Sequence, residues 1–523
     1  MTNLLTRLNI AFIIEFLFVI LIAVGIMPRE GALFLAVFLP IVLLTVSLEE
    51  SVFFIARSIP LFLALPITES FDNFNIWRII ISVIFLKLVI AQKQQIIASC
   101  KNIVDETKKS LFSGLKFVYS RYKFEFLIAV LFSISLFSLL ESEDLGAGIK
   151  RVVYFVNLGL LFFIVRYAIN HGNFMRLGRN FIFSSIIISM VGIIQLISAY
   201  LMPIGNFAEY WAFVIERNLY GNTWAQIAIS ANTWFAYFNS TIHLRMFSSF
   251  PDSHSFPLYL LIASIFVASF IAFQRSVAKT CKPAYVILGL FSLCLALSGT
   301  RGIWAAVIVP ILIIIFYYFR KIQPKEVISK LSLPIIFFIV ALIISQPIFN
   351  SKQFRLLENQ IAQENILAGR LISIFNSEET SNQGRIQIWK ESIKSIIKNP
   401  FLGVGIGNFP TVLKQDISMA KAGSSAHNLF LQILAEMGIF AFAIFLIIIY
   451  EIYKKAQTLS NDQNILVKFF GLLSILYIGW ILTYTMTDPA IFDERVFLAL
   501  MILIGTIFGL NKELQITKVK IRN

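Results

Sequence analysis

The residue of this sequence best suited to chemistry is His427, one of only four histidines in the chain. It lies in SSAHNLFLQILAEMGIFAF (424–442), directly before a strongly apolar stretch. Imidazole accepts and releases a proton near neutral pH, so a histidine at the mouth of a membrane helix could act as a general base. The alternative is a histidine that only makes hydrogen bonds at the helix end.

A line of polar residues follows His427 into the apolar stretch. Asn428 is well placed to cap a helix, and Gln432 and Glu436 then recur at four-residue spacing on one helical face. Because polar side chains are costly in lipid, this face should point to the bundle interior or to a water-filled cavity. We therefore expect Asn428, Gln432 and Glu436 to line a cavity that opens at His427.

Three arginines are predicted on the same side of the membrane as His427. Arg301 lies in a very short turn of LALSGTRGIWAAV, Arg385 lies in the first turn of a predicted helix, and Arg245 lies just before an apolar stretch. Guanidinium groups bind phosphate oxygens through paired hydrogen bonds and stay charged. Together with the histidine they predict a diphosphate site. For Arg385 taken alone, an ion pair with a carboxylate or a lipid phosphate is an equally good interpretation.

The composition indicates the scaffold that must position these residues. Hydrophobic residues make up 58% of the 523 positions and charged residues only 14%, which excludes a soluble globular protein. The apolar stretches, roughly 17 to 25 residues each, are long enough to cross a hydrocarbon core about 30 Å thick as helices. They do not alternate as barrel strands do. The predicted fold class is all-α, a polytopic inner-membrane protein with about 14 transmembrane helices.

The distribution of basic residues predicts the orientation. Connections predicted to lie inside contain about 23 Lys and Arg, and the short outer connections contain about four. Both termini should therefore be cytoplasmic, and the net charge of +15 does not call for nucleic acid as a partner. The first span lacks a small-residue cleavage site and is expected to be retained. The predicted spans lie near 8–27, 31–48, 51–67, 76–91, 124–140, 152–169, 181–202, 257–274, 283–299, 302–320, 331–347, 429–453, 464–486 and 494–510.

Two longer segments interrupt the spans and divide the chain. Both are predicted to lie outside, which in a bacterial inner membrane is the periplasm. The cysteines, Cys100, Cys281 and Cys294, lie at inner loops or within a span, so no structural disulfide is expected. The predicted parts are N-terminal transmembrane helices (1–202), a first periplasmic insertion (203–256), further transmembrane helices (257–347), a large periplasmic loop (348–428) and C-terminal transmembrane helices (429–523).

The large loop contains a predicted amphipathic helix followed by a glycine-rich turn. In GRIQIWKESIKSIIKNP (384–400), Ile and Trp recur at helical spacing with lysines on the other faces, so the helix should lie in the membrane interface and end at Pro400. In the next residues, Gly403 and Gly405 let the backbone pass close to something bulky or anionic, and we place them with the cavity-lining residues. Their spacing is not that of a dinucleotide fingerprint, and a tight packed turn is the favoured interpretation.

The order of these motifs resembles a known family. SGTRG, then GRIQIWKESIKSIIKNPFLGVGIGNF, then AHNLFLQILAEMGIFAF are similar to successive motifs of the O-antigen ligase and polymerase superfamily, over roughly 245–453. The resemblance implies a GT-C-like membrane glycosyltransferase that acts at the periplasmic face on glycans linked to undecaprenyl diphosphate, without a metal or other cofactor. By position, Arg301 and Arg385 would hold the diphosphate and His427 would act near the acceptor. Arg245 resembles a further family arginine, in a segment that fits the pattern only loosely.

The chemistry that the resemblance implies agrees with the residues. A sugar hydroxyl that attacks an anomeric carbon needs a base, and the departing diphosphate needs a counter-charge. Imidazole suits the first task, and guanidinium groups suit the second in place of a metal. The outer loops contain no Asp-x-Asp pair and no His/Cys cluster at ligand spacing, so no metal site is expected.

The choice between polymerase and ligase stays open. Either enzyme would use the same lipid-linked donor; the acceptor would be another glycan, lipid A-core or a protein, and a chain-length regulator protein would be a further partner. The alternative function is a flippase for lipid-linked oligosaccharide or another transporter, which many spans and in-membrane residues such as Glu15 would also suit. The sequence shows no inverted repeat, and a lid-like outer loop favours the transferase.

Overall fold

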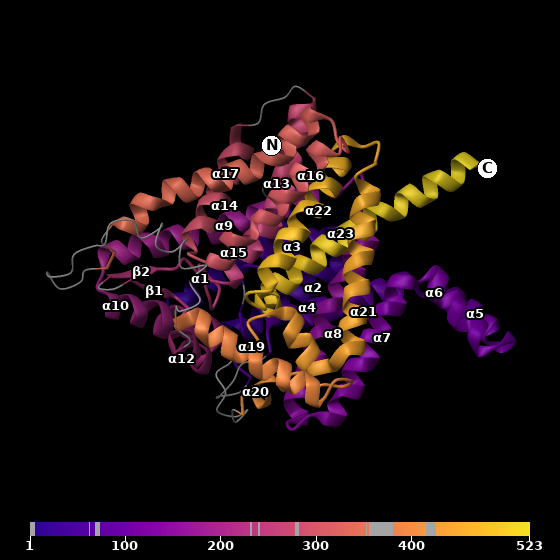
Figure 1. The fold of residues 1–523 in the computed structure, drawn as a ribbon, viewed down its shortest axis with the longest axis horizontal. Helices are drawn as coiled ribbons and strands as arrows, with labels where there is room; N and C mark the ends of the chain where they lie inside the picture. The colour runs from indigo at the N-terminus through magenta and orange to yellow at the C-terminus, as the bar shows by residue number, and fades with distance from the viewer. Residues whose placement is uncertain are drawn as a thin grey trace.

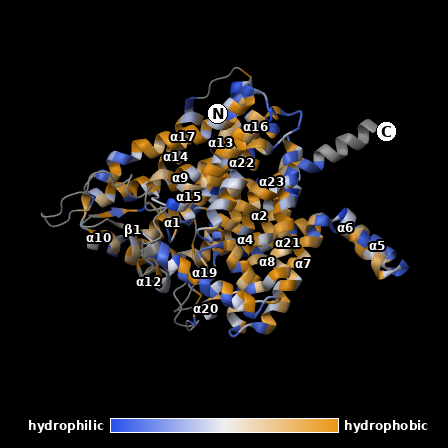
Figure 2. Cartoon of the chain, in the orientation of Figure 1, coloured by the Kyte–Doolittle hydropathy of each residue, from blue (hydrophilic) through white to orange (hydrophobic). Residues whose placement is uncertain are grey.

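The protein is a bundle of long helices with a small folded insertion at one end (Figure 1). The structure, a computed structural model, describes residues 6–61, 63–67, 74–230, 233–238, 241–277, 282–351, 353–354, 380–414 and 425–522. Much of the predicted outer loop, residues 355–379 and 415–424, therefore lies outside the described residues. Figure 2 shows that hydrophobic residues dominate along the bundle and that hydrophilic residues gather in its connections.

The described elements follow in chain order. The first half contains α1 (Arg7–Ala23), α2 (Gly31–Thr45), α3 (Leu48–Ser58), α4 (Ile76–Ala91), α5 (Lys93–Lys109), α6 (Leu111–Arg121), α7 (Lys123–Ser138), η1 (Leu139–Glu141), α8 (Leu145–Ala168), α9 (Phe174–Leu201), α10 (Ile204–Ala208), the π-helix η2 (Glu209–Glu216), α11 (Arg217–Tyr220), α12 (Asn222–Ser230), β1 (Phe235–Phe238) and β2 (Thr241–Leu244). The second half contains α13 (Ser255–Ser276), α14 (Lys282–Leu297), α15 (Arg301–Ala306), α16 (Ile308–Phe319), α17 (Lys325–Asn350), α19 (Thr380–Lys398), α20 (Phe409–Val412), α21 (Leu429–Leu459), α22 (Ile465–Thr485), η3 (Ala490–Phe492) and α23 (Glu494–Arg522).

The helices bear out a polytopic membrane protein but not the predicted number of spans. Within the described residues, nine helical segments are long and apolar enough to cross a membrane, and two shorter apolar helices, α2 and α14, accompany them. The predicted span at 51–67 is not one helix, because α3 ends at Ser58 after 11 residues and can cover only about 16 Å. Pro60, two residues after Ser58, has no backbone N–H with which to continue the helix. Which end of the bundle faces the cytoplasm stays a prediction.

The most buried helices form the centre of the bundle and end at the site. In α13, 89% of the most apolar window is buried, compared with 22% in α7, which leaves most of its surface to lipid. Helix α13 packs against α22 and α14, and α23 packs along α8. The connections that enter α13 and link α22 to α23 are therefore anchored to the protein core.

The first insertion is a folded unit that contains the strands of the described chain. β1 and β2 pair antiparallel, with Phe235 opposite Leu244. The rings of Trp234 and Phe247 stack with centroids 4.2 Å apart inside an aromatic cluster beneath this hairpin. The all-α expectation thus holds for the bundle, and the hairpin is an exception confined to the insertion. Outside the membrane span a short hairpin can satisfy its backbone polar groups with neighbouring protein and water.

Two ends of the bundle can be distinguished by contacts. Lys123, at the start of α7, pairs with Glu451 of α21 at 2.6 Å. At the other end of α7, Ser138 Oγ accepts a hydrogen bond from the backbone N–H of Ile406, at 3.2 Å. We call the second end the site end, because His427, at the start of α21, lies there. Cys100 and Cys294 are free thiols, and Cys281 lies outside the described residues.

Candidate functional site

A histidine and a buried aspartate form the central contact of the site. His427 Nδ1 lies 3.3 Å from Oδ2 of Asp488, which belongs to the turn between α22 and α23. The side chain of His427 is 35% exposed and that of Asp488 only 13%. His427 has a φ of 45°, a conformation that residues with a Cβ rarely adopt. The adjacent Asn428 caps α21 by accepting backbone N–H bonds at 3.0 and 3.2 Å, as the sequence predicted.

A second histidine, His254, lies on the other side of Asp488. Its Nδ1 is 3.5 Å from the same Oδ2, an ion-pair distance, and its Nε2 is 3.4 Å from Nη2 of Arg245. Burial lowers the pKa of His254 to about 3; Asp488 opposes this shift and Arg245 adds to it. His254 is therefore neutral at neutral pH. Because a guanidinium can only donate, Nε2 accepts, and the imidazole proton lies on Nδ1 facing Asp488.

Asp488 is a carboxylate at neutral pH. Burial opposes its ionisation, but His254, a hydrogen bond to His427 and the charge of Arg385 together lower the pKa of Asp488 below its usual range. The same carboxylate oxygen thus faces both imidazoles. The result is a continuous polar chain from Arg245 through His254 and Asp488 to the partly exposed His427.

The three predicted arginines lie within electrostatic reach of one another. Burial lowers the pKa of Arg245 to about 10; Tyr484 opposes this, and the charges of Arg301 and Arg385 add to it. Arg245 stays charged at neutral pH, so three positive charges crowd together. Its Nε is buried and has no hydrogen-bond partner in the described part of the chain. A bound anion would reduce the mutual repulsion and give this donor an acceptor.

Each arginine is positioned by a different element. The backbone N–H of Arg245 donates to Trp234 O at 2.8 Å, which continues the β1–β2 ladder by one residue, and its Nη2 donates to Thr300 Oγ1 at 3.4 Å. Thr300 directly precedes Arg301, the first residue of α15. A Cβ on the next residue, Gly302, would lie 2.2 Å from Thr487 Oγ1. Only a glycine therefore lets α15 pack this closely against the turn that carries Asp488.

Helix α19 carries Arg385 and packs against the start of α21. Trp389 Nε1 donates to Ala426 O at 3.0 Å, directly before His427. The helix ends at Lys398, as predicted from Pro400, but it begins at Thr380, earlier than expected. Part of the predicted apolar stripe stays exposed, with Ile393 48% and Ile397 74% accessible. This outer stripe agrees with an interfacial helix, although the placement of α19 in the membrane interface stays a prediction.

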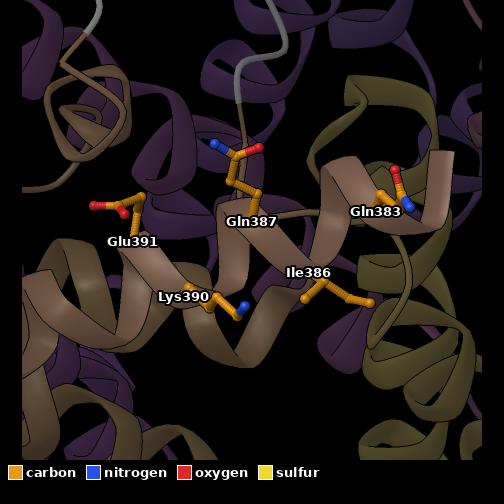
Figure 3. Close-up of a pocket in the computed structure, with 5 residues that line it drawn as sticks. All are labelled: Gln383, Ile386, Gln387, Lys390 and Glu391. Carbon is orange, nitrogen blue, oxygen red and sulfur yellow. The ribbon is translucent and has the colours of Figure 1, made fainter. Parts of the chain in front are cut away.

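A hollow of about 450 Å³ lies along α19, on the face opposite Arg385. At 100° per residue, its lining residues share one side of the helix, whereas Arg385, Ile388 and the buried Ser392 share the other. The hollow is thus a feature of the outer face of α19 and not of the charged cluster. Figure 3 shows its lining residues, Gln383, Ile386, Gln387, Lys390 and Glu391.

The glycine-rich turn packs closely against α21. Gly403 has a φ of 68°, and a Cβ there would lie 2.4 Å from Ala435 O. Helix α21 is broken at Gly438, with a φ of 75°, and Ile439 N donates to Pro400 O at 2.9 Å. A Cβ at Gly405 would lie 2.0 Å from Ser142 Oγ. Gly403 and Gly405 thus lie in close packing, as the tight-turn interpretation predicted, and their place beside a cavity stays a prediction.

The polar line of α21 faces the bundle interior. Gln432 is 3% and Glu436 5% exposed, which agrees with the expected bundle interior, and a cavity that opens at His427 stays a prediction. Gln432 Oε1 accepts from Ala426 N at 2.8 Å, and its Nε2 donates to Glu436 Oε1 at 2.7 Å. Glu436 also accepts backbone N–H bonds from Gly407 and Phe409. These side chains satisfy one another and hold the glycine-rich turn and the residue before His427 in place.

Two residues of this site were missed by sequence reasoning. His254 lies in the same short segment as Arg245, nine residues further along. Asp488 is an acidic residue in the short turn TDPA between two apolar helices. The available signal was an acid and a histidine in turns predicted on the same side as His427, but turns have no periodicity from which contact could be inferred.

Part of this chain is similar to a known family. Residues 285–446 match a family model described as O-Antigen ligase. An uncharacterized protein of Haemophilus influenzae is 26% identical over 215 residues, which cover 39% of this chain and 51% of that protein. The chain therefore spans about half the length of this curated relative. The matched family region contains Arg301, Arg385 and His427, whereas Arg245, His254 and Asp488 lie outside it.

Proposed function

We propose that this chain, a member of the O-antigen ligase and polymerase superfamily through residues 285–446, is a membrane glycosyltransferase. It moves a glycan from a polyprenyl diphosphate, undecaprenyl diphosphate in bacteria, to an acceptor hydroxyl. The observation that carries the proposal is the partly exposed His427, paired with buried Asp488 beside three clustered arginines. The site faces the periplasm in this scheme, on a GT-C-like scaffold.

The arginines bind the diphosphate of the donor. Arg245, Arg301 and Arg385 approach from a hairpin, a helix start and a loop helix, so they can surround a group with several anionic oxygens. Guanidinium groups form paired hydrogen bonds to such oxygens and stay charged throughout turnover. They also stabilise the charge that develops on the departing diphosphate, the role that a metal ion often has in sugar transfer.

His427 acts as the base for the acceptor. Asp488 accepts a hydrogen bond from the Nδ1–H of His427. The other ring nitrogen, Nε2, can then accept a hydrogen bond from the incoming hydroxyl. The hydroxyl oxygen forms a bond to the anomeric carbon while its proton passes to His427 Nε2. The bond from the anomeric carbon to the diphosphate oxygen breaks, and both of its electrons leave with the diphosphate. Asp488 stabilises the imidazolium that results.

The acceptor distinguishes two forms of this activity. A polymerase would extend another lipid-linked glycan, whereas a ligase would transfer the glycan to lipid A-core or a protein. Deletion of the gene, followed by gel analysis of surface glycan, separates them. Lipid A-core capped by single repeats indicates a polymerase, and long glycan that stays on the lipid carrier indicates a ligase. If the deletion changes neither the glycan on lipid A-core nor the glycan on the lipid carrier, the proposal is contradicted.

Substitution of His427 tests the mechanism. The variant His427→Ala should abolish transfer while donor binding, which we assign to the arginines, is kept; loss of a general base typically costs about 10²–10⁴-fold in rate. His427→Gln can accept a hydrogen bond but takes no proton at neutral pH, so activity in Gln with none in Ala would make His427 a positioning residue. The matched control is His171→Ala, because His171 pairs with Asp462 at 3.2 Å away from the site. Normal activity in both His427 variants would refute the assignment.

A further inference from the structure

The helices α5 and α6 form a hairpin that projects from the bundle. Figure 1 shows both helices extending away from the remaining helices, beyond the start of α7. No residue of α5 is buried, and only Gly114 is buried in α6. The hairpin leaves the bundle at the end of α4 and returns at Lys123, where the membrane-spanning α7 begins. Its base is therefore fixed at a membrane boundary, at the end of the bundle opposite the site.

Internal contacts hold the hairpin in one shape. A Cβ at Gly114 would lie 2.2 Å from Thr107 Oγ1, so α6 packs closely on α5 at this point. Ser113 Oγ donates to Glu106 Oε2 at 2.9 Å, and Tyr122 OH donates to Ser99 Oγ at 3.0 Å. These contacts join the two helices near both ends of the hairpin. The exposed side chains consequently belong to an ordered surface.

This surface carries apolar side chains that the described part of the chain leaves exposed. On α6, Phe112, Leu115 and Tyr119 follow one another at helical spacing on one face. The helices have a clear amphipathic pattern, which Figure 2 shows as hydrophobic and hydrophilic residues alternating along both. The large apolar side chains that are at least 41% exposed are Ile96, Ile97, Val104, Leu111, Phe112, Leu115 and Tyr119. Exposed large apolar side chains that gather on one structural unit mark a contact with a membrane or a protein.

The charge of the hairpin identifies its partner as lipid. Residues 92–123 contain seven basic and two acidic residues, and Glu106 is already paired with Lys109 at 2.5 Å. Apolar residues on one face and an excess of lysines elsewhere are typical of helices that lie in the headgroup region of an anionic bilayer. The connection to α4 and α7 places this face at the membrane boundary without any further movement.

We propose that the α5–α6 hairpin lies on the membrane surface opposite the site end, with its apolar face in the headgroup region and its lysines on anionic phospholipid. The hairpin anchors the bundle to the membrane surface without crossing the bilayer. The hairpin lies outside the family region at 285–446, and this contact is independent of the transferase activity.

Fluorescent labelling of the full-length protein in vesicles tests this contact. Cys100 lies on the apolar side of α5 and is exposed, so an environment-sensitive dye can be attached there after Cys281→Ser and Cys294→Ala. In vesicles rich in phosphatidylglycerol, iodide should quench this dye roughly three-fold less than a dye at Asp105→Cys on the polar face, because lipid shields only the apolar face. Lipids brominated near the carbonyl should quench the first dye and not the second. The Asp105→Cys variant also carries Cys100→Ser.

Three outcomes would overturn the proposal. Equal iodide quenching at both positions would show that the apolar face stays in water. Shielding that disappears when the protein is diluted in lipid would identify a second copy of the chain as the partner. Shielding that is the same in pure phosphatidylcholine, and unaffected by Lys108→Glu with Lys109→Glu, would remove the role of anionic lipid. A shielded Cys100 dye that responds to lipid charge supports the proposal.

Discussion

The variant Asp488→Asn removes a single charge from the centre of the site and keeps the size of the side chain. In the wild-type protein the carboxylate oxygen lies 3.3 Å from His427 Nδ1 and 3.5 Å from His254 Nδ1. An amide can turn its NH₂ group toward Nδ1, which would move the imidazole proton to Nε2. His427 would then present a donor to the acceptor hydroxyl and could no longer remove its proton.

The expected loss follows from the geometry. When His427 gains a proton, its attraction to Asp488 is worth about 4 kcal/mol at 4 Å with an effective dielectric constant near 20. The 35% exposure of His427 admits water and screens part of this, so we take about 2 to 4 kcal/mol. At 1.36 kcal/mol for each factor of ten, the rate should fall roughly 30- to 1000-fold. This is below the roughly 10⁴-fold loss known for a fully buried triad aspartate.

The assay is glycan transfer from lipid-linked donor in vesicles, with donor binding measured in parallel. The matched control is Asp462→Asn, because Asp462 is likewise a buried partner of a histidine, His171, at 3.2 Å. We expect the control to keep normal transfer and both variants to reach wild-type levels in the membrane. Less than a three-fold loss in Asp488→Asn, or an equal loss in Asp462→Asn, would refute the reasoning.

The remaining predictions concern charge, packing and pH. Arg301→Lys should lower transfer at least about ten-fold, because a point charge cannot make two parallel hydrogen bonds. The control Arg320→Lys, on a different turn, should keep normal transfer. Normal activity of Arg301→Lys in the vesicle assay would count against a diphosphate site. Gly403→Ala should lower the melting temperature, because its Cβ would meet Ala435 O. The control Gly384→Ala has open space around the new Cβ and should keep or raise the melting temperature. Equal shifts in the two variants would contradict the close packing at Gly403. Burial and the charges of Asp493 and Asp488 raise the pKa of Asp252 to about 6, above its value of about 4 in an unfolded chain. Ionisation of Asp252 therefore opposes folding, and the protein gains stability as the pH falls from above 6 toward 4. Asp252→Asn should therefore reduce the gain in melting temperature between pH 7.5 and pH 5, and an undiminished gain would rule out this group as its source.

The membrane bundle could be predicted because its signal is local. Length and hydropathy decide whether a stretch can cross a bilayer, and both are visible in any window of the sequence. The predicted span at 51–67 was wrong, because contacts between distant segments decide the backbone there. α3 ends at Ser58, and Ala64 N, six residues further on, donates to Leu219 O at 2.9 Å. The break of α21 at Gly438 exists because the turn at Pro400 inserts there.

The proximity of the arginines and His427 could be predicted, because each stands in a motif with its own context, and their roles stay predictions. The chain that connects them was not predicted. The chain is built from three places in the sequence: Arg245 at the end of a hairpin, His254 at the start of α13 and Asp488 in the turn after α22. Tyr484 OH of α22 donates to His254 O at 3.1 Å and so joins α22 to the start of α13. A single carboxylate oxygen faces both imidazoles, so loss of either contact changes the charge that the other experiences. The arginine cluster and the base are therefore coupled through Asp488, and a variant of His254 should alter donor binding and proton transfer together. Such coupling depends on distances between turns far apart in the sequence, which residue type and spacing do not encode.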